Sequence, residues 1–410
     1  MSATGPYRYG DRVMPLLAPY RRLLAIPGAT SFWPAALIGR MPLSMVGLGL
    51  VLLVQSSTGS YAVAGTVTAT YTVCFALCSV LHGRLIDRYG QGLVLRAAGV
   101  AFGLSMLLTI CVAEAHLPRA LLYLGAALTG IAFPQCGSAV RSRWTHLLDD
   151  PAAVQSALAL ESVGDEVVFI FGPVVTTVLA TTVGPGVALG LALLAGAGGT
   201  VAFGLCRSTE PPVHATHHEN AVRPPFGWLK MAPALVLCVG FGMTFGGYEV
   251  TTVAFASHHG ERAVAGVLLA MGSLGSLVAA LIIGVIRWRL TPTTRLRGGA
   301  FLLAVAMLPL GFIPSVWLLG GWMLIGGLAI APTTVGLNTF TERVVPPARL
   351  NEGMAVLGTG IVAGNAPGSS ITGWVIDNHG TSAAYFVCAA AAVVGALATI
   401  LLPRTSNASR

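Results

Sequence analysis

Three acidic residues lie within six positions of one strongly apolar segment, 159–175: Glu161, Asp165 and Glu166. An ionised carboxylate near the centre of a bilayer costs roughly 2.5–3.5 kcal/mol even on the mildest insertion scales. Glu161 and Asp165 are four residues apart and share one face of a helix, whereas Glu166 is turned by about 100° from Asp165. A carboxyl group removed from water has a raised pKa and can exchange a proton near neutral pH. The segment therefore indicates proton chemistry inside a membrane.

Two further ionisable residues, Arg40 and Glu249, lie within other apolar segments. One arginine neutralises one carboxylate well, so a surplus of acids must be hydrogen-bonded, hydrated or protonated. The predicted proton-coupling set is Arg40, Glu161, Asp165, Glu166 and Glu249, with at least one of the last three as the coupling group. The alternative is structural. Arg40 and one acid then form a strut, a second acid is simply protonated, and Glu249 is a solvated acid in an outer vestibule.

The composition indicates a membrane protein. Of the 410 residues, 55% are hydrophobic and only 9% are charged, whereas about a quarter are charged in a soluble domain. The 51 glycines fit closely packed membrane helices. The net charge of +8 lies in short clusters between apolar runs, which argues against a nucleic-acid partner. We therefore expect an all-α polytopic membrane protein, and we expect its seven cysteines to be packing thiols.

Twelve apolar stretches are long enough for a helical span of about 20 residues. The first six are 31–55, 61–82, 93–113, 118–140, 153–180 and 186–206. The second six are 229–256, 263–286, 298–314, 316–338, 353–375 and 382–403. The polar, proline-rich segment between them predicts three parts, which are an N-terminal bundle 1–206, a cytoplasmic linker 207–228 and a C-terminal bundle 229–410.

The basic residues predict the orientation of these spans. With the N-terminus in the cytoplasm, the cytoplasmic segments carry 20 lysines and arginines, and only Arg119 and Arg262 fall on the outer side. Cytoplasmic loops of membrane proteins are enriched in Lys and Arg. Both termini are therefore expected on the cytoplasmic side of the plasma (inner) membrane. A shift of 201 residues also places Arg88 and Arg96 on Arg289 and Arg297, as expected of duplicated halves.

One motif between spans 2 and 3, GRLIDRYGQGLVLR at 83–96, carries a family resemblance. It resembles the loop signature of the major facilitator superfamily, G-x-x-x-D-[RK]-x-G-[RK]-[RK]. Gln91 and Gly92 stand where two further basic residues are usual. The residues assigned to this motif are Gly83, Asp87, Arg88, Gly90 and Arg96. The resemblance covers nearly the whole chain and implies a twelve-helix transporter of two pseudo-symmetric bundles.

The resemblance also implies a gate. In the family, the loop aspartate, here Asp87, meets the cytoplasmic N-terminus of span 11 and locks the halves while the inner gate is shut. Span 11 begins near Asn351, a suitable N-cap, and its positive dipole end favours an exposed carboxylate by about 0.3–1 kcal/mol. The second half carries Trp288 in place of the aspartate. The alternative is a solvated turn that contains an aspartate.

A second signature is partial. Proton-linked drug exporters of this superfamily carry G-x-x-x-G-P-x-x-G-G on span 5, and Gly172–Pro173 supplies its Gly-Pro core. Proline removes one backbone hydrogen bond and kinks the helix, while glycine permits close contact with the other half. Thr176 and Thr177 replace the trailing glycines, and the arginine that these exporters carry early in span 4 is missing from 125–134.

The resemblance further predicts which residues meet. Spans 1 and 5 are neighbours in this fold, so Arg40 is expected to pair with Glu161 or Asp165. Spans 1, 4, 7 and 10 line the central cavity, where the sequence supplies an aromatic, weakly polar pocket suited to an amphiphilic organic molecule. A phosphate carrier would need more than one cavity arginine. The candidate lining residues are Trp33, Arg40, Ser44, Phe133, Tyr248, Trp322 and Asn338.

The function expected from these features is secondary active export of a small amphiphilic compound, with inward proton flow and alternating access of the two halves. The alternatives are a proton-coupled or facilitative importer of a nutrient or metabolite, and a transporter-like sensor or lipid-handling protein. We expect a monomer that is not an enzyme and binds no cofactor or metal, including at His214, His217 and His218. The sequence has no G-x-x-x-x-G-K-[ST] motif for ATP-driven pumping.

Overall fold

The computed structural model of the protein describes residues 18–212, 227–285, 291–346 and 350–403. Within these ranges the regular structure is helical, with no strand. Eleven stretches of this part of the chain are long and apolar enough to cross a membrane. The last of them, Val356–Leu401, contains two spans joined at Gly380, whose φ of 82° breaks the helix. The expected all-α polytopic membrane fold is confirmed.

The first half follows a short helix, α1 (Ala18–Leu24). Its helices are α2 (Ala29–Arg40), α3 (Pro42–Thr58), α4 (Tyr61–Tyr89), α5 (Gln91–Glu114), α6 (Arg119–Ala132), α7 (Cys136–Leu147), α8 (Pro151–Thr182) and α9 (Pro185–Leu205). Those of the second half are α10 (Trp228–His258), α11 (Ala265–Val285), α12 (Pro292–Met307), α13 (Val316–Gly327), α14 (Ile330–Val344) and α15 (Leu350–Ala398). Short 3-10 turns η1 (Arg207–Thr209), η2 (Arg262–Val264), η3 (Leu308–Phe312) and η5 (Thr399–Leu401) adjoin them.

Three of the expected spans are broken near a proline. Span 1 divides into α2 and α3 at Pro42, and span 4 divides into α6 and α7 around Pro134. Span 10 divides at Leu328, which lies four residues before Pro332, where a proline ring clashes with the helical carbonyl. Span 4 also continues to residue 147 instead of ending near 140, so Arg141 lies in a helix and not in the expected loop.

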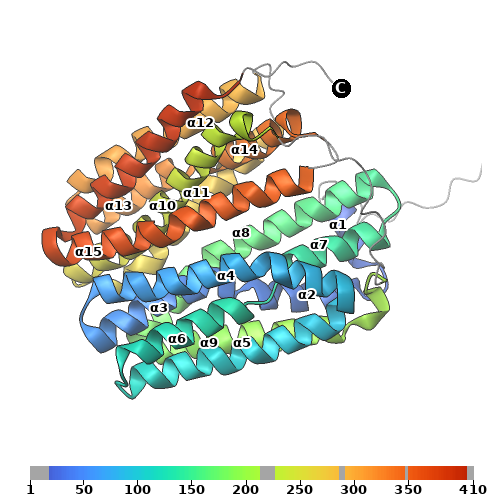
Figure 1. Ribbon diagram of the computed structural model, residues 1–410, viewed down its shortest axis with the longest axis horizontal. Coiled ribbons are helices and arrows are strands. Elements are labelled where there is room, and N and C mark those ends of the chain that lie inside the picture. The colour runs from blue at the N-terminus through green and yellow to red at the C-terminus, as the bar shows by residue number, and fades with distance from the viewer. Residues whose placement is uncertain (1–17, 213–226, 286–290, 347–349, 404–410) are drawn as a thin grey trace, which may run out of the picture.

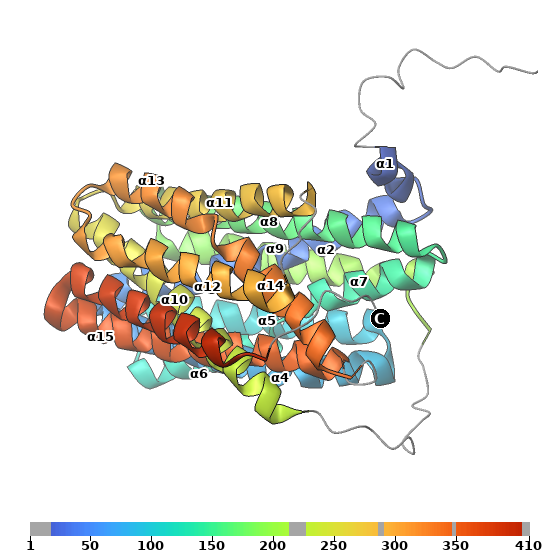
Figure 2. The ribbon, with the colours of Figure 1, turned by 90° about the horizontal axis from the view of Figure 1, so that it is seen from above.

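The helices form two bundles that lie side by side, with α2–α9 in one and α10–α15 in the other (Figure 1). Helix α1 and the end of α15 lie toward the same end of the molecule, which we call the terminal end (Figures 1 and 2). The opposite, distal end holds the start of α4 and the turn of α15 at Gly380 (Figure 1). The predicted linker 207–228 falls partly outside the described residues, as do the three histidines within it.

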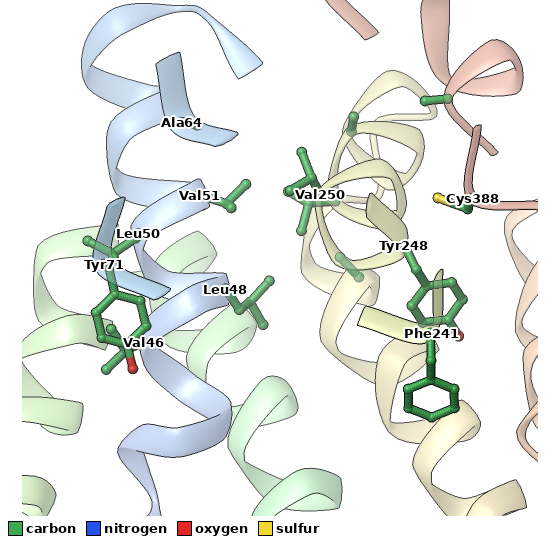
Figure 3. Close-up of a cluster of buried hydrophobic side chains, with 14 of the residues drawn as sticks. Val46, Leu48, Leu50, Val51, Ala64, Tyr71, Phe241, Tyr248, Val250 and Cys388 are labelled. Carbon is green, nitrogen blue, oxygen red and sulfur yellow. The ribbon is translucent and has the colours of Figure 1, made fainter. Parts of the chain in front are cut away.

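The halves contact each other through α4 with α15, α8 with α11 and α3 with α10. A Cβ added at Gly65 would overlap the backbone carbonyl of Ser369, so the α4–α15 crossing requires a glycine there. Figure 3 shows Leu48 and Val51 of α3 pointing toward α10, which carries Val250. These side chains are buried and fill the interface between α3 of the first half and α10 of the second half.

Candidate transport cavity and charged network

A cavity of about 370 Å³ lies between the two halves, a size typical of small-molecule sites. Helices α3, α4 and α8 of the first half and α10, α11, α14 and α15 of the second half supply its walls. Five aromatic side chains line it: Tyr71, Phe75, Phe169, Phe245 and Tyr248. Its uncharged polar lining residues are Ser44, Thr68, Thr72, Ser273 and Asn365. The pocket is therefore predominantly aromatic and apolar, with scattered hydroxyl groups and one amide.

Glu249 on α10 is the only Asp, Glu, Lys, Arg or His among the described residues that line this cavity. Its carboxylate lies against Gly47 of α3, where an added Cβ would be 3.2 Å from Oε1. A larger residue at 47 would therefore press on the acid. Within the described part of the chain, the Glu249 carboxylate has no hydrogen bond or ion pair. The cavity thus contains one acidic group and, among its described lining residues, no basic side chain to balance it.

A second charged group lies outside the cavity, where α2, α7 and α8 meet. Arg40 Nη1 donates to Asp165 Oδ1 at 2.8 Å, and Arg40 Nη2 makes an ion contact of 2.6 Å with Glu161 Oε2. The other Glu161 oxygen accepts the indole N–H of Trp144 at 2.7 Å. The other Asp165 oxygen lies 2.5 Å from Arg141 Nη2. Two arginines face two carboxylates, so this network is balanced in charge.

Arg143, on the same helix as Arg141 and Trp144 of this network, anchors three helices. Its side chain is fully buried and donates to Gln91 Oε1 at 2.8 Å and to the Cys206 carbonyl at 2.7 Å. The guanidinium also lies 4.1 Å from the ring centroid of Phe203. These contacts join the start of α5, helix α7 and the end of α9 in a fixed arrangement.

At the distal end, Asp377 of α15 binds the first turn of α4 in the other half. Its Oδ2 accepts hydrogen bonds from Ser60 Oγ at 2.7 Å and from Ala62 N at 2.8 Å, and its Oδ1 accepts one from Tyr61 N at 3.1 Å. Free N–H groups and the positive dipole end make a helix N-terminus a ready site for an anion. We call this contact the distal clamp. Arg262 adds a hydrogen bond of 3.1 Å to the Leu52 carbonyl across the same interface.

The sequence profile of the Major Facilitator Superfamily matches residues 32–326 and 256–410. The chain belongs to this superfamily. Among curated proteins, the MFS-type transporter y4rN of Sinorhizobium fredii is 26% identical in an alignment 407 residues long. The match covers 94% of this chain and 97% of that protein. The protein is therefore a multi-pass membrane transporter and not an enzyme.

Solved transporter structures share its fold. PepTSo, a POT family transporter, is 13% identical, with a TM-score of 0.71 over 92% of this chain and 97% of its own. The nucleoside transporter NupG, in a mutant form, is 14% identical, with a TM-score of 0.69 over 91% and 99%. A bacterial homologue of the iron transporter ferroportin, in its inward-facing state, is 14% identical, with a TM-score of 0.70 over 93% and 100%. At these identities the likeness shows the fold alone.

Two of the predicted cavity residues of the transporter, Ser44 and Tyr248, line the observed cavity. Phe133 lies behind its wall, with its ring centroid 4.9 Å from that of Phe75. Trp322 packs toward α12 and donates to the Ala306 carbonyl at 2.7 Å. Asn338 is exposed on α14, Trp33 packs beside a second buried cluster, and Arg40 belongs to the charged network. Each break in spans 1, 4 and 10 begins a new helix with its own rotation. The helical periodicity before a break therefore does not predict which residues after it face the cavity.

The predicted proton-coupling residues separate into three places. Arg40 contacts both Glu161 and Asp165, where the sequence led us to expect one of them. Glu166 is half-buried, and it belongs neither to the charged network nor to the cavity lining. Glu249 lies in the cavity instead of an outer vestibule. Sequence reasoning missed Arg141 because the helix break at Pro134 concealed that span 4 continues. It also missed Asp377, whose partners precede it by more than 300 positions.

The motif at 83–96 lies mostly in helices and not in a loop. Helix α4 continues to Tyr89, so Asp87 and Arg88 occupy its last turn. The chain turns at Gly90, whose φ of 85° strongly favours glycine, and Arg96 lies in α5, where it donates to the Gly92 carbonyl. Asp87 is exposed and has no partner in the described part of the chain. The side chain of Asn351 lies outside the described set.

The Gly172–Pro173 pair lies where α8 contacts both α3 of its own half and α11 of the other half. Pro173 lines the cavity, and a Cβ added at Gly266 of α11 would overlap the Pro173 carbonyl. A Cβ added at Gly172 would overlap the hydroxyl of Ser44, which donates to the Val168 carbonyl at 2.7 Å. The pair therefore marks a close approach of α8 to α3 on one side and to α11 on the other.

Proposed function

We propose that this transporter is a secondary active exporter that moves a small amphiphilic organic compound outward in exchange for protons. The single observation that carries the proposal is Glu249, a carboxylate with no basic partner among the described residues of the cavity between the halves. An ionised acid in such a site is unfavourable unless a proton or a positively charged group joins it. A group that changes protonation in the cavity can couple proton movement to transport.

Two acids of α8, Glu161 and Asp165, have a structural role in this mechanism. Asp165 lies between two guanidinium groups, and the Glu161 carboxylate contacts Arg40 and Trp144. Each of these carboxylates therefore has a guanidinium counter-charge within the protein. We therefore assign this network to the strut that joins α2, α7 and α8, and we assign proton coupling to Glu249.

In this proposal the substrate crosses the membrane by alternating access, in which the two halves open first one end of the cavity and then the other. The positive charges of the loops favour both termini in the cytoplasm of the plasma (inner) membrane, which makes the distal end the outer end. The distal clamp of Asp377 then closes the outer side while Asp87 has no partner among the described residues. In the opposite state the clamp opens and Asp87 binds the start of α15. We propose that the transporter acts as a monomer, since the cavity is formed by the two halves of one chain.

An importer of a nutrient or metabolite is the second candidate. Proteins of the same fold include the nucleoside transporter NupG and the POT family transporter PepTSo. Export is favoured by the Gly172–Pro173 pair on α8, which matches the core of the exporter signature. The two candidates differ in the direction of proton movement that substrate induces.

Inside-out membrane vesicles with an acidic lumen test the proposal. We expect an exported compound added outside to alkalinise the lumen, because each turnover moves protons out as the compound moves in. Glu249→Gln should abolish this signal, while Glu114→Gln, an exposed acid at the end of α5, should keep it. Unchanged proton movement in Glu249→Gln would refute the coupling role. Acidification of the medium by lumenal substrate leaving the vesicles would instead support the importer.

A further inference from the structure

The described residues that line the cavity carry a negative charge and no positive charge. Glu249 contributes a negative charge, and no Lys, Arg or His is among the described residues of its lining. An anionic ligand would meet an unbalanced carboxylate and gain no counter-charge. A neutral ligand would leave the buried charge unpaired. A monovalent cation is the ligand that balances this site.

The aromatic side chains of the cavity suit the same ligand. Tyr71 and Phe75 of α4 are stacked, with ring centroids 6.4 Å apart and planes within 13°. Phe245 and Tyr248 face the cavity from α10, with centroids 6.2 Å apart. Aromatic faces attract a cation within about 6 Å through the ring quadrupole, and they also accommodate an apolar body. Rings from both halves therefore line the same cavity as Glu249.

Two polar groups in the wall have no protein partner among the described residues. The Thr68 side chain is only 4% exposed, and its Oγ1 makes no hydrogen bond in the described part of the chain. The Asn365 amide also lines the cavity, and no described residue is hydrogen-bonded to it. Buried polar groups are ordinarily paired, so these two groups leave hydrogen-bonding capacity unused in the wall. An ammonium N–H is a suitable donor to the Glu249 carboxylate, and the side-chain amide of Asn365 offers a second acceptor in the lining.

We propose that the cavity binds monovalent organic cations with an aromatic or aliphatic body, and that Glu249 holds their charge. This inference rests on the proposed function and names the class of its substrate. The carboxylate binds either the cation or one proton, because both neutralise the same single charge. Exchange of one for the other at Glu249 gives obligatory antiport without a second ionisable site.

The sign of the pH dependence follows. Cation binding requires the ionised carboxylate, so affinity is greatest at high pH and falls as the pH drops through the protonation of Glu249. The only other titratable groups around the cavity, among the described lining residues, are the phenols of Tyr71 and Tyr248. Both are neutral in the same pH range, so they do not add a second step.

Tetraphenylphosphonium is a suitable probe because its charge is permanent and any pH effect must come from the protein. Tetraphenylborate has the same shape with the opposite charge. We expect purified transporter in nanodiscs to bind tetraphenylphosphonium by equilibrium binding of the radiolabelled ion and not tetraphenylborate. Glu249→Gln should weaken binding about 100-fold and remove its pH dependence.

Matched variants separate the cation site from general damage. Glu114→Gln removes an exposed acid outside the cavity and should leave binding unchanged. Tyr71→Phe keeps the ring and should bind within about twofold, whereas Tyr71→Leu should bind about fivefold more weakly. Unfolding midpoints and gel-filtration profiles of all variants show which are folded. The wild-type comparison of the two ions does not depend on any variant.

Equal binding of both ions, or tetraphenylphosphonium binding that is independent of pH, overturns the cation site. Binding that persists in folded Glu249→Gln overturns the role of the carboxylate. Glu249-dependent proton movement with only neutral or anionic compounds would reject the cation inference while the proposed exporter stands. Cation binding without any proton movement would retain the site and reject the coupled exporter.

Discussion

Replacing Asp377 by alanine tests the distal clamp, which joins two helices of different halves. The carboxylate accepts three hydrogen bonds from the first turn of α4, at 2.7, 2.8 and 3.1 Å. Alanine removes all three. Asparagine removes the charge and keeps only one acceptor oxygen, so both variants should favour opening of the distal end.

The expected magnitude follows from the exposure of these contacts. A hydrogen bond to a charged group is worth about 1.5–3 kcal/mol in a buried site. The bonds from Ser60 and Ala62 are exposed, where a carboxylate at a helix N-terminus contributes about 0.3–1 kcal/mol. We therefore expect a total loss of about 1–2 kcal/mol, which shifts the closed-to-open ratio of the distal end by about 5–30-fold.

Spin-label distance measurements across the distal end provide the assay. Labels at the exposed residues Leu117 of the first half and His379 of the second half should report a new or enlarged long-distance population in Asp377→Ala. Asn378→Ala is the matched control, because the Asn378 side chain donates within its own helix, to the Trp374 carbonyl. Identical distance distributions in wild type and Asp377→Ala would refute the clamp.

Two further predictions concern the other charged groups. Arg40→Gln should lower the free energy of unfolding by about 3–5 kcal/mol, because it leaves buried Glu161 without its counter-charge, whereas Arg141→Gln should lower it by less than about 1 kcal/mol. Chemical denaturation in detergent measures both, and equal losses would contradict the assignment. Asp87→Asn should leave the label distance of the distally closed state unchanged and reduce the population of the opposite state about two- to fivefold, measured by spin labels at the terminal end. A shifted label distance in the distally closed state would show that Asp87 has a partner there.

The sequence predicted the membrane spans well because the constraint is local. Each span is identified by its own length and hydropathy, and a helix satisfies its own backbone hydrogen bonds in lipid. Helix breaks were predicted poorly because a proline marks where a helix is weakened and does not say how the next segment is oriented. The continuation of span 4 to Leu147 is one such case, and it brings Arg141 to Asp165.

The candidate site was only partly predictable, because it depends on contacts between distant segments. Glu249 and the α8 acids were recognised as unusual by residue type alone. Nothing in the chain reveals that two of those acids share two arginines while Glu249 has none among the described residues. The distal clamp likewise joins residues more than 300 positions apart, and no local pattern connects them.

By itself, the sequence determined that this is a helical membrane transporter with charges retained inside its spans, because hydropathy and the free energy of burying a charge depend on residue type. The tertiary structure decided what each charge contacts, because a carboxylate's neighbours come from segments far apart in the chain. Two guanidinium groups and an indole make Glu161 and Asp165 parts of a strut. Glu249 instead lies against a glycine in a cavity lined by aromatic rings, which is why we assign proton and cation exchange to it.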